Sequence, residues 1–186
     1  TDQDAVEQIA TRGKILPTNT NQDYLAVFNT NIHGQKSDAK IRQSLSHQAI
    51  INDDGTISDS IIITRTHTGQ TQEKMYGAHN IDYIRVYVPK GSELISASGF
   101  TWPDEASFYV PENYYKTDDL LNQTEKEIKI DERTGTRITQ EFDKTAFGNW
   151  VITVPGQTSQ IQFTYRLPFR IDTIDGTNQN NIWQKL

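Results

Sequence analysis

Six aromatic side chains gather in one irregular stretch of the sequence, residues 100–115, with acidic and amide side chains between them. Aromatic rings stack on the apolar faces of sugar rings or on peptide side chains, and carboxylates and amides bond to hydroxyl groups. The stretch therefore predicts a ligand-binding surface. The alternative, which we favour, is that the aromatic side chains cap one open end of a β-sandwich. The candidate ligand-binding residues are Phe100, Trp102, Asp104, Tyr109, Glu112, Tyr114 and Tyr115.

Two of these residues, Asp104 and Glu112, are of the type that a glycosidase uses as its acid and base. Such a pair works only at a defined separation of the two carboxyl groups, which a sequence does not give. Acidic residues are ordinary in loops. We therefore expect no catalytic residue, and keep a hydrolase acting on cell-envelope glycan as the alternative.

The four histidines, His33, His47, His67 and His79, show no metal-binding pattern. None of them lies at the spacing of two to five residues that zinc-binding pairs use, and the chain has no cysteine. They are expected to be solvated loop residues. We predict no metal and no cofactor.

The sequence Asn-Asp-Asp-Gly at 52–55, followed by Asp59, offers the oxygen ligands that calcium prefers. It does not reproduce the twelve-residue calcium loop with its terminal glutamate. A tight turn needs the same residue types, because Asp-Gly supplies the positive-φ positions of a hairpin. The pattern favours a hairpin turn.

A Lys-Ser-Asp sequence at 36–38 raises the question of a serine–lysine hydrolase. A serine nucleophile needs a strained elbow or a helix start together with an oxyanion pocket, and neither is indicated. The better interpretation is structural, with Ser37 or Asp38 bound to backbone amides and Lys36 paired with a carboxylate. A covalent bond between a lysine and an asparagine or aspartate is a further alternative.

The composition of the 186-residue chain narrows the classes of function. Its net charge of −6 argues against a nucleic-acid partner and against an anionic membrane surface. Without cysteine, disulfides and thiolate metal sites are excluded. Only 34% of the residues are hydrophobic, which fits antiparallel sheets with one solvated face better than a helical bundle.

The densest apolar pattern lies at residues 80–100, NIDYIRVYVPKGSELISASGF. Side chains of an extended chain alternate between two faces, and here both faces are largely apolar. Ile81 and Tyr87 lie on one face, and Ile84 and Val86 on the other. This pattern is typical of a strand in the middle of a sheet that is covered on both sides. A Pro-Lys-Gly-Ser turn then leads to a second strand.

Other strands are predicted from the same two-residue period, and about eight of them form an antiparallel β-sandwich of the Ig-like or Greek-key type. Leu45 and Ile51 are expected on a buried face, as are Ile128, Ile130 and Phe142 of a second hairpin, whose mixed charges mark an exposed sheet edge. The predicted segments are 24–32, 39–52, 57–66, the hairpin at 124–143, 147–155 and 158–168.

The chain divides into three parts by its pattern. Residues 1–20 predict a short helix, over about 2–12, and a linker. Residues 21–170 are expected to form the β-sandwich domain, and 171–186 a C-terminal strand or tail.

Four blocks of the chain resemble a known family: DYLAVFNTNIHGQKSD (23–38), IDYIRVYVPKGSELISASG (81–99), KTAFGNWVITVPGQTSQIQFTYRLP (144–168) and WQK (183–185). In order and spacing they are similar to the C-terminal region of the bacterial family called domain of unknown function 4012. The resemblance implies a β-rich portion outside the membrane, in an envelope protein with an N-terminal membrane helix. It implies no known activity. The amino-terminal blocks of the family are missing here, so we expect a fragment.

These observations lead to one expected function and two alternatives. The chain is expected to be a non-catalytic extracellular module at the bacterial cell surface, for attachment, assembly or binding. Its possible partners are cell-wall glycan or a surface protein, with no nucleic acid, and with the membrane only through a missing N-terminal anchor. The alternatives are the glycan hydrolase and a purely structural stalk domain.

Overall fold

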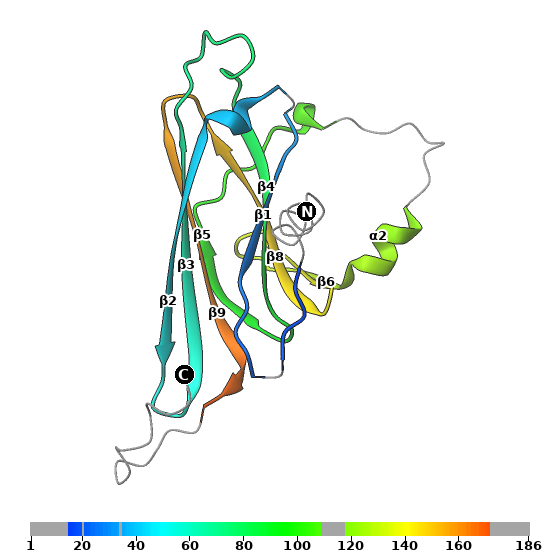
Figure 1. The fold of residues 1–186 in the computed structure, drawn as a ribbon. Coiled ribbons are helices and arrows are strands. Elements are labelled where there is room, and N and C mark those ends of the chain that lie inside the picture. The colour runs from blue at the N-terminus through cyan, green and yellow to red at the C-terminus, as the bar shows by residue number, and fades with distance from the viewer. Residues whose placement is uncertain (1–14, 20, 34, 109–117, 172–186) are drawn as a thin grey trace, which may run out of the picture.

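The computed structural model describes residues 15–19, 21–33, 35–108 and 118–171, and these form two antiparallel β-sheets that face each other (Figure 1). The five-stranded sheet has the order β1 (Ala26–Asn31), β4 (Asn80–Pro89), β8 (Lys144–Thr153), β7 (Arg137–Glu141) and β6 (Lys126–Ile130). The four-stranded sheet has the order β2 (Ile41–Ile51), β3 (Thr56–His67), β9 (Thr158–Arg170) and β5 (Glu93–Ser98). The predicted all-β sandwich is confirmed, with nine strands in the described part. The predicted helix at 2–12, and the tail after Ile171, lie outside the described residues.

The core lies between the sheets and follows the predicted alternation. In β3 every second residue is buried, including Ile61 and Ile63, which are fully inaccessible to solvent. Ile84 and Val86 of β4 face them from the other sheet and are also fully buried. Each such side chain contributes about 1.5–3 kcal/mol on burial, before chain entropy is subtracted. The prediction that β4 is a central, covered strand is therefore confirmed.

Glycine turns connect the strands where the sequence predicts them. Gly55 joins β2 to β3 with φ +80°, and its N–H donates to the carbonyl of Asn52 over 2.9 Å. Gly135 and Gly156, with φ +68° and +77°, close the turns between β6 and β7 and between β8 and β9. These dihedral angles are easy for glycine and strained for other residues. The strands on either side of the turn at Gly91 enter different sheets, so β4 and β5 form no hairpin.

The edge strands correct part of the prediction. Leu45 and Ile51 of β2 are 42% and 57% exposed, and Ile128 and Ile130 of β6 are 50% and 54% exposed. Phe142, after β7, is 60% exposed. The expectation that these side chains are buried was wrong. β2 and β6 are the last strands of their sheets, so the facing sheet does not cover their side chains, and Phe142 lies in the tight turn between β7 and β8, with φ +51°. Alternation along a strand gives the parity of its faces but not its place in the sheet.

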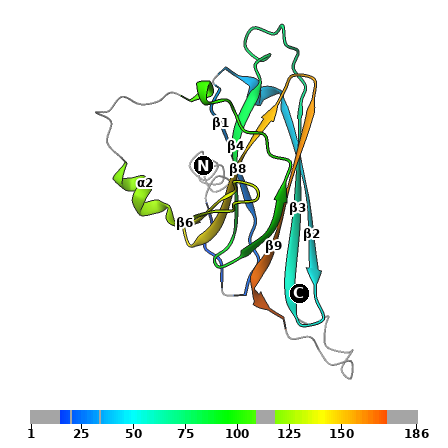
Figure 2. The same ribbon diagram turned by 180° about the vertical axis from the view of Figure 1, so that it is seen from behind.

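The connection between β5 and β6 reaches the outer face of the five-stranded sheet. It contains two short helices, η2 (Glu105–Ser107) and α2 (Asp119–Thr124). Figures 1 and 2 show α2 beyond the five-stranded sheet, on the side away from β3 and β9. Asp118 begins α2 by accepting hydrogen bonds from the N–H groups of Leu120 and Leu121. This connection includes the predicted ligand-binding stretch.

Candidate functional site

The predicted ligand-binding residues fall into two groups. Tyr109, Glu112, Tyr114 and Tyr115 lie outside the described residues. Phe100, Trp102 and Asp104 are described and occupy different environments. Phe100 is partly buried and packs on the core residue Phe163, with ring centroids 5.3 Å apart. It therefore belongs to the packing between the sheets.

Trp102 is the most exposed aromatic side chain of the described part of this stretch, at 57%. Its indole lies against the turn between β6 and β7, where a Cβ on Gly135 would come within 2.6 Å of Cζ2. Glycine at this position thus serves both the positive φ of the turn and the approach of the ring. Pro103 next to it is buried, and Asp104 is exposed. The segment holds the indole against a turn while leaving more than half of the side chain in solvent.

A chain of three aromatic rings lies on the outer face of the five-stranded sheet. Phe108 packs edge-on against Trp150 of β8 at 5.4 Å, and Trp150 packs against Tyr83 of β4 at 4.8 Å. Tyr83 lies across β8 at Gly148, where any Cβ would collide with its hydroxyl. Phe108 was expected to cap an open end of the sandwich. It instead covers Trp150 on the outer face of the sheet.

A cavity of about 440 Å³ lies on the same face, between Phe28, Leu121 and Phe142. At its floor the hydroxyl of Tyr87 donates to Oε2 of Glu141 over 2.7 Å, and Arg85 Nη1 lies 3.5 Å from the same oxygen. Burial, and then the neighbouring Glu141, raise the pKa of Tyr87. The sequence pattern did not indicate this cavity, although the odd-numbered positions of β4 place Arg85 and Tyr87 on one outer face.

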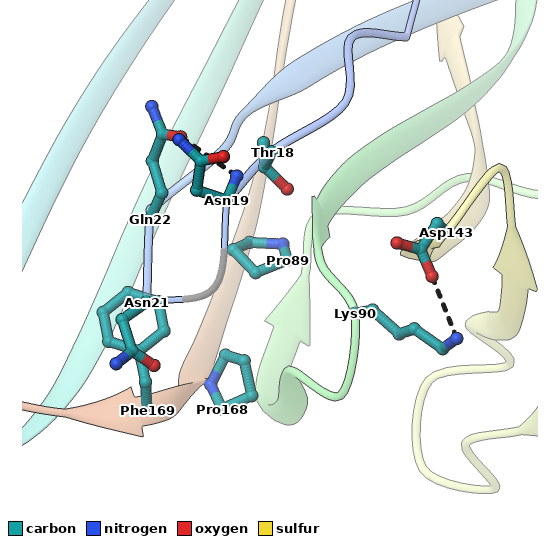
Figure 3. A pocket seen from close by; sticks show the side chains of 9 residues that line it. All are labelled: Thr18, Asn19, Asn21, Gln22, Pro89, Lys90, Asp143, Pro168 and Phe169. Carbon is teal, nitrogen blue, oxygen red and sulfur yellow. Dashed lines mark hydrogen bonds and ion pairs between the residues drawn. The ribbon is translucent and has the colours of Figure 1, made fainter.

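A second, smaller cavity of about 260 Å³ lies where β4 and β9 end (Figure 3). Pro89 and Pro168 form part of its wall. Lys90 Nζ pairs with Asp143 Oδ1 over 2.9 Å at its rim, and both side chains are largely exposed. An exposed pair of this kind contributes little free energy.

Ser37 has the structural role that the sequence favoured. It is fully buried, and its hydroxyl oxygen accepts hydrogen bonds from the side-chain amides of Asn31 and Asn80, over 3.0 and 3.1 Å. Asp38 accepts another from Asn80 over 2.7 Å. The partners are side-chain amides, where backbone amides were expected, and Lys36 is exposed. A buried hydroxyl held by two amides offers no path for a substrate.

The Ser37 cluster continues to a buried ion pair between the sheets. Arg65 of β3 is 2% exposed and donates to the amide oxygens of Asn29, Gln43 and Asn80 over 2.8, 2.5 and 2.7 Å. Asp82 of β4 is fully buried, with Oδ2 3.0 Å from Arg65 Nη1. Burial raises the pKa of Asp82 to about 6 against the opposing charge of Arg65. This network joins the sheets and leaves no room for a ligand.

The histidines differ from each other more than expected. His33 and His79 are exposed. His67 is fully buried, its Nδ1 accepts from the N–H of Gly69 over 3.1 Å, and its Nε2 lies 3.0 Å from the carbonyl of Ala78. The expectation of a solvated histidine is wrong for His67, because the loop after β3 folds over its ring. His47, on β2, lies beside Asp59.

Within the described segments, one group of histidine and carboxylate side chains is close enough to hold a metal ion: Asp23, His47 and Asp59.

The turn at 52–55 is bonded as a hairpin turn, because the Asp54 carboxylate accepts from the N–H and the hydroxyl of Thr56 over 3.0 and 2.6 Å. The hairpin interpretation of that turn is confirmed. The sequence signal for Asp59 was its position, a charge between Ile57 and Ile61 on the inner face of β3.

Comparison with known proteins returned no match to a family model, to a curated protein or to a solved structure. The resemblance to domain of unknown function 4012 therefore stays a prediction. In the part of the chain that the structure describes, every helix is too short or too polar to cross a membrane.

Proposed function

We propose that the chain is a non-catalytic β-sandwich module of a bacterial surface protein, and that it binds its ligand at Trp102 and Phe108 beside the outer face of the five-stranded sheet. The observation that carries this proposal is the environment of Trp102. Its side chain is 57% exposed although it is held against Gly135. Water is an unfavourable environment for an indole, and a ring fixed in advance loses little entropy on binding.

The chemistry of the surface favours a glycan of the cell wall. An exposed indole and the half-exposed ring of Phe108 offer flat apolar faces to sugar rings. Asp104, exposed between them in sequence, supplies carboxylate oxygens that accept hydrogen bonds from sugar hydroxyls. A surface protein with an exposed aromatic or proline side chain is the second kind of partner that this surface suits.

The surface supports binding better than hydrolysis. A glycosidase needs two carboxyl groups on opposite sides of one sugar bond. Glu141, which is buried on this face, already accepts hydrogen bonds from Tyr87 and from Thr139. Asp104 lies in an exposed segment, before η2. The placement in a bacterial envelope is supported by the four sequence blocks and by the acidic net charge of −6.

A sedimentation assay with purified peptidoglycan tests the proposal. Trp102→Ala and Phe108→Ala are each expected to weaken binding by about five- to thirtyfold, since one aromatic contact contributes about 1–2 kcal/mol. The control is Leu45→Ala, which removes an exposed apolar side chain from β2 in the other sheet. Equal binding by all three variants, or no binding by the unaltered chain, would contradict the proposal for peptidoglycan.

The same incubation separates binding from hydrolysis. We expect no soluble sugar fragments to be released, and no loss of binding with time. Release of fragments that stops on Asp104→Asn would show a hydrolase instead. A pull-down that recovers a surface protein and loses it on Trp102→Ala would identify a protein ligand at the same surface.

A further inference from the structure

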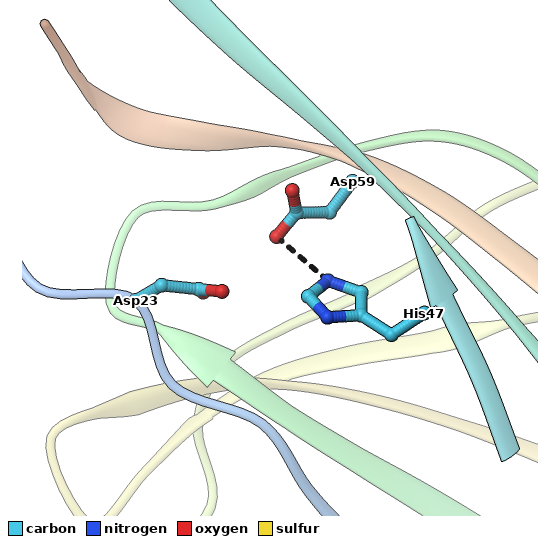
Figure 4. Close-up of side chains that lie close together, drawn as sticks. All are labelled: Asp23, His47 and Asp59. Carbon is cyan, nitrogen blue, oxygen red and sulfur yellow. Dashed lines mark ion pairs between the residues drawn. The ribbon is translucent and has the colours of Figure 1, made fainter. Parts of the chain in front are cut away.

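Three side chains from three separate segments meet at the open edge between the sheets (Figure 4). Asp23 precedes β1, His47 lies on β2 and Asp59 on β3. One ligand atom of each lies within 4.8 Å of the others, and Nε2 of His47 is 3.3 Å from Oδ2 of Asp59. Figure 4 shows the Asp23 carboxylate pointing toward the other two side chains.

Asp59 is the unusual member of this group. It is fully buried, and neither of its carboxylate oxygens has a hydrogen-bond partner within the described residues. Within the described residues its ion-pair partner is the partly exposed imidazole of His47. A buried carboxylate without a bonded partner is unfavourable unless something neutralises it.

The strand around Asp59 does not need a carboxylate. Its neighbours on the inner face of β3, Ile57 and Ile61, are buried apolar residues. Tyr165 of β9 is directly opposite Asp59 in the sheet, and its buried hydroxyl also has no hydrogen-bond partner. The hydroxyl of Tyr165 and the carboxylate of Asp59 therefore lie close together, beside an imidazole nitrogen.

We propose that Asp23, His47 and Asp59 bind one divalent transition-metal ion, zinc or manganese, with water completing its coordination. Two carboxylates and an imidazole are a ligand set that these ions accept. Calcium prefers six to eight oxygen ligands and magnesium rarely uses imidazole, so both ions fit the set less well.

The geometry allows the site to close. In a tetrahedral zinc site with bonds of about 2.0–2.1 Å, ligand atoms lie about 3.3 Å apart, close to the observed separation of His47 and Asp59. Asp23 is exposed and lies in a segment without regular structure, so an inward shift of up to about 1.5 Å would complete the set. One of its oxygens accepts from the N–H of Tyr24 over 2.7 Å. The other remains for the metal.

The bound ion would have a structural role. It would tie the segment before β1, which leads into the five-stranded sheet, to β2 and β3 of the four-stranded sheet. The inner face of β2 is otherwise poorly covered at this edge, as the exposure of Leu45 and Ile51 shows. This role is independent of ligand binding at Trp102.

Calorimetric titration of the full chain, freed of any affinity tag and stripped with a chelator, tests the site. Zn²⁺ or Mn²⁺ is expected to bind with one-to-one stoichiometry and to raise the melting temperature. His47→Gln and Asp59→Asn are each expected to weaken binding by about tenfold or more. The controls are His79→Gln and Asp54→Asn, which alter exposed residues outside the group and leave binding unchanged. If Asp59→Asn perturbs the fold, His47→Gln still tests the site, because the His47 side chain is partly exposed.

Cobalt gives a second measurement that does not depend on stability. Co²⁺ bound to the unaltered chain should show the visible absorption bands that are typical of a four- or five-coordinate ion. His47→Gln should abolish these bands. The proposal is overturned by no binding of Zn²⁺ or Mn²⁺, by binding that survives both substitutions, or by a preference for Ca²⁺ or Mg²⁺ over the transition metals.

Discussion

The inner face of β3 carries two charged side chains, Asp59 and Arg65, with the buried Ile61 and Ile63 between them. Arg65 meets a buried counter-charge, Asp82, and three amide oxygens. Asp59 meets no full counter-charge: its neighbours are the partly exposed imidazole of His47, the hydroxyl of Tyr165 and a second carboxylate, Asp23. Asp82 also lacks hydrogen bonds to its oxygens, but a guanidinium lies 3.0 Å from it.

The difference between the two positions separates a structural charge from a functional one. A buried charge is tolerated when the fold supplies the opposite charge and the polar contacts around it. The chain does so at Arg65 with residues from β1, β2 and β4. At Asp59 it does not, so the charge there is expected to need a partner from outside the chain.

The largest effect on the free energy of unfolding is expected for Arg65→Met, which removes the counter-charge of the buried Arg65–Asp82 pair. Asp82 would stay buried without a counter-charge, and the free energy of unfolding should fall by about 3–5 kcal/mol. Urea unfolding followed by circular dichroism measures it. Adding Asp82→Leu to the same chain should restore most of the loss, and a loss below about 1 kcal/mol in the single variant would contradict this account.

The pH dependence of stability, compared between the unaltered chain and Asp82→Asn, tests the same buried ion pair. The pKa of Asp82 is raised from 3.8 to about 6 in the folded chain. Between about pH 4 and 6 the folded chain therefore binds a proton at this residue that the unfolded chain does not bind. The unfolding free energy of the unaltered chain should therefore rise as pH falls through this window, relative to the variant, by about 3 kcal/mol in total. Denaturant unfolding at four pH values would show it, and parallel curves for the two chains would contradict it.

At Asp59, a smaller change in the free energy of unfolding, of opposite sign, is expected. In the presence of a chelator, Asp59→Asn should raise the free energy of unfolding by about 1 kcal/mol, because a neutral amide replaces a buried carboxylate without bonded partners. Thermal and urea unfolding at pH 7 measure the change. A loss of stability as large as that of Arg65→Met would show that the fold itself needs Asp59.

The smallest effect is expected for Tyr165→Phe. The hydroxyl is buried beside Asp59 without a hydrogen bond of normal geometry, so its removal should change the free energy of unfolding by less than about 0.5 kcal/mol. The matched control is Tyr87→Phe, whose hydroxyl does donate to Glu141 and whose loss should cost about 1–2 kcal/mol. Equal losses for the two would remove the distinction.

Much of the fold was predictable because alternation is a local property. The central position of β4 followed from its two apolar faces, and the turns at Gly55, Gly135 and Gly156 followed from turn-forming residue types. The positions of β2 and β6 at sheet edges were not predictable in this way. The order of strands in a sheet depends on contacts between residues far apart in sequence, so Leu45 and Ile128 were expected to be buried.

The candidate sites were less predictable than the fold, because each one brings distant segments together. Trp102 was identified by its residue type, but its contact with Gly135 depends on how the connection folds back on the sheet. Asp59 was considered only as part of the turn at 52–55. Its meeting with Asp23 and His47 depends on the pairing of β2 with β3 and on the path of the chain before β1.

The place of β9 between β3 and β5 has a consequence for how the chain reaches its native state. Gln162 of this strand donates to Ser60, 102 residues earlier, so the four-stranded sheet cannot be completed until β9 has emerged from the ribosome. Such a high contact order is typical of folding on the millisecond-to-second scale. A version of the protein that ends before β9 would leave both β3 and β5 as open template edges, prone to self-association.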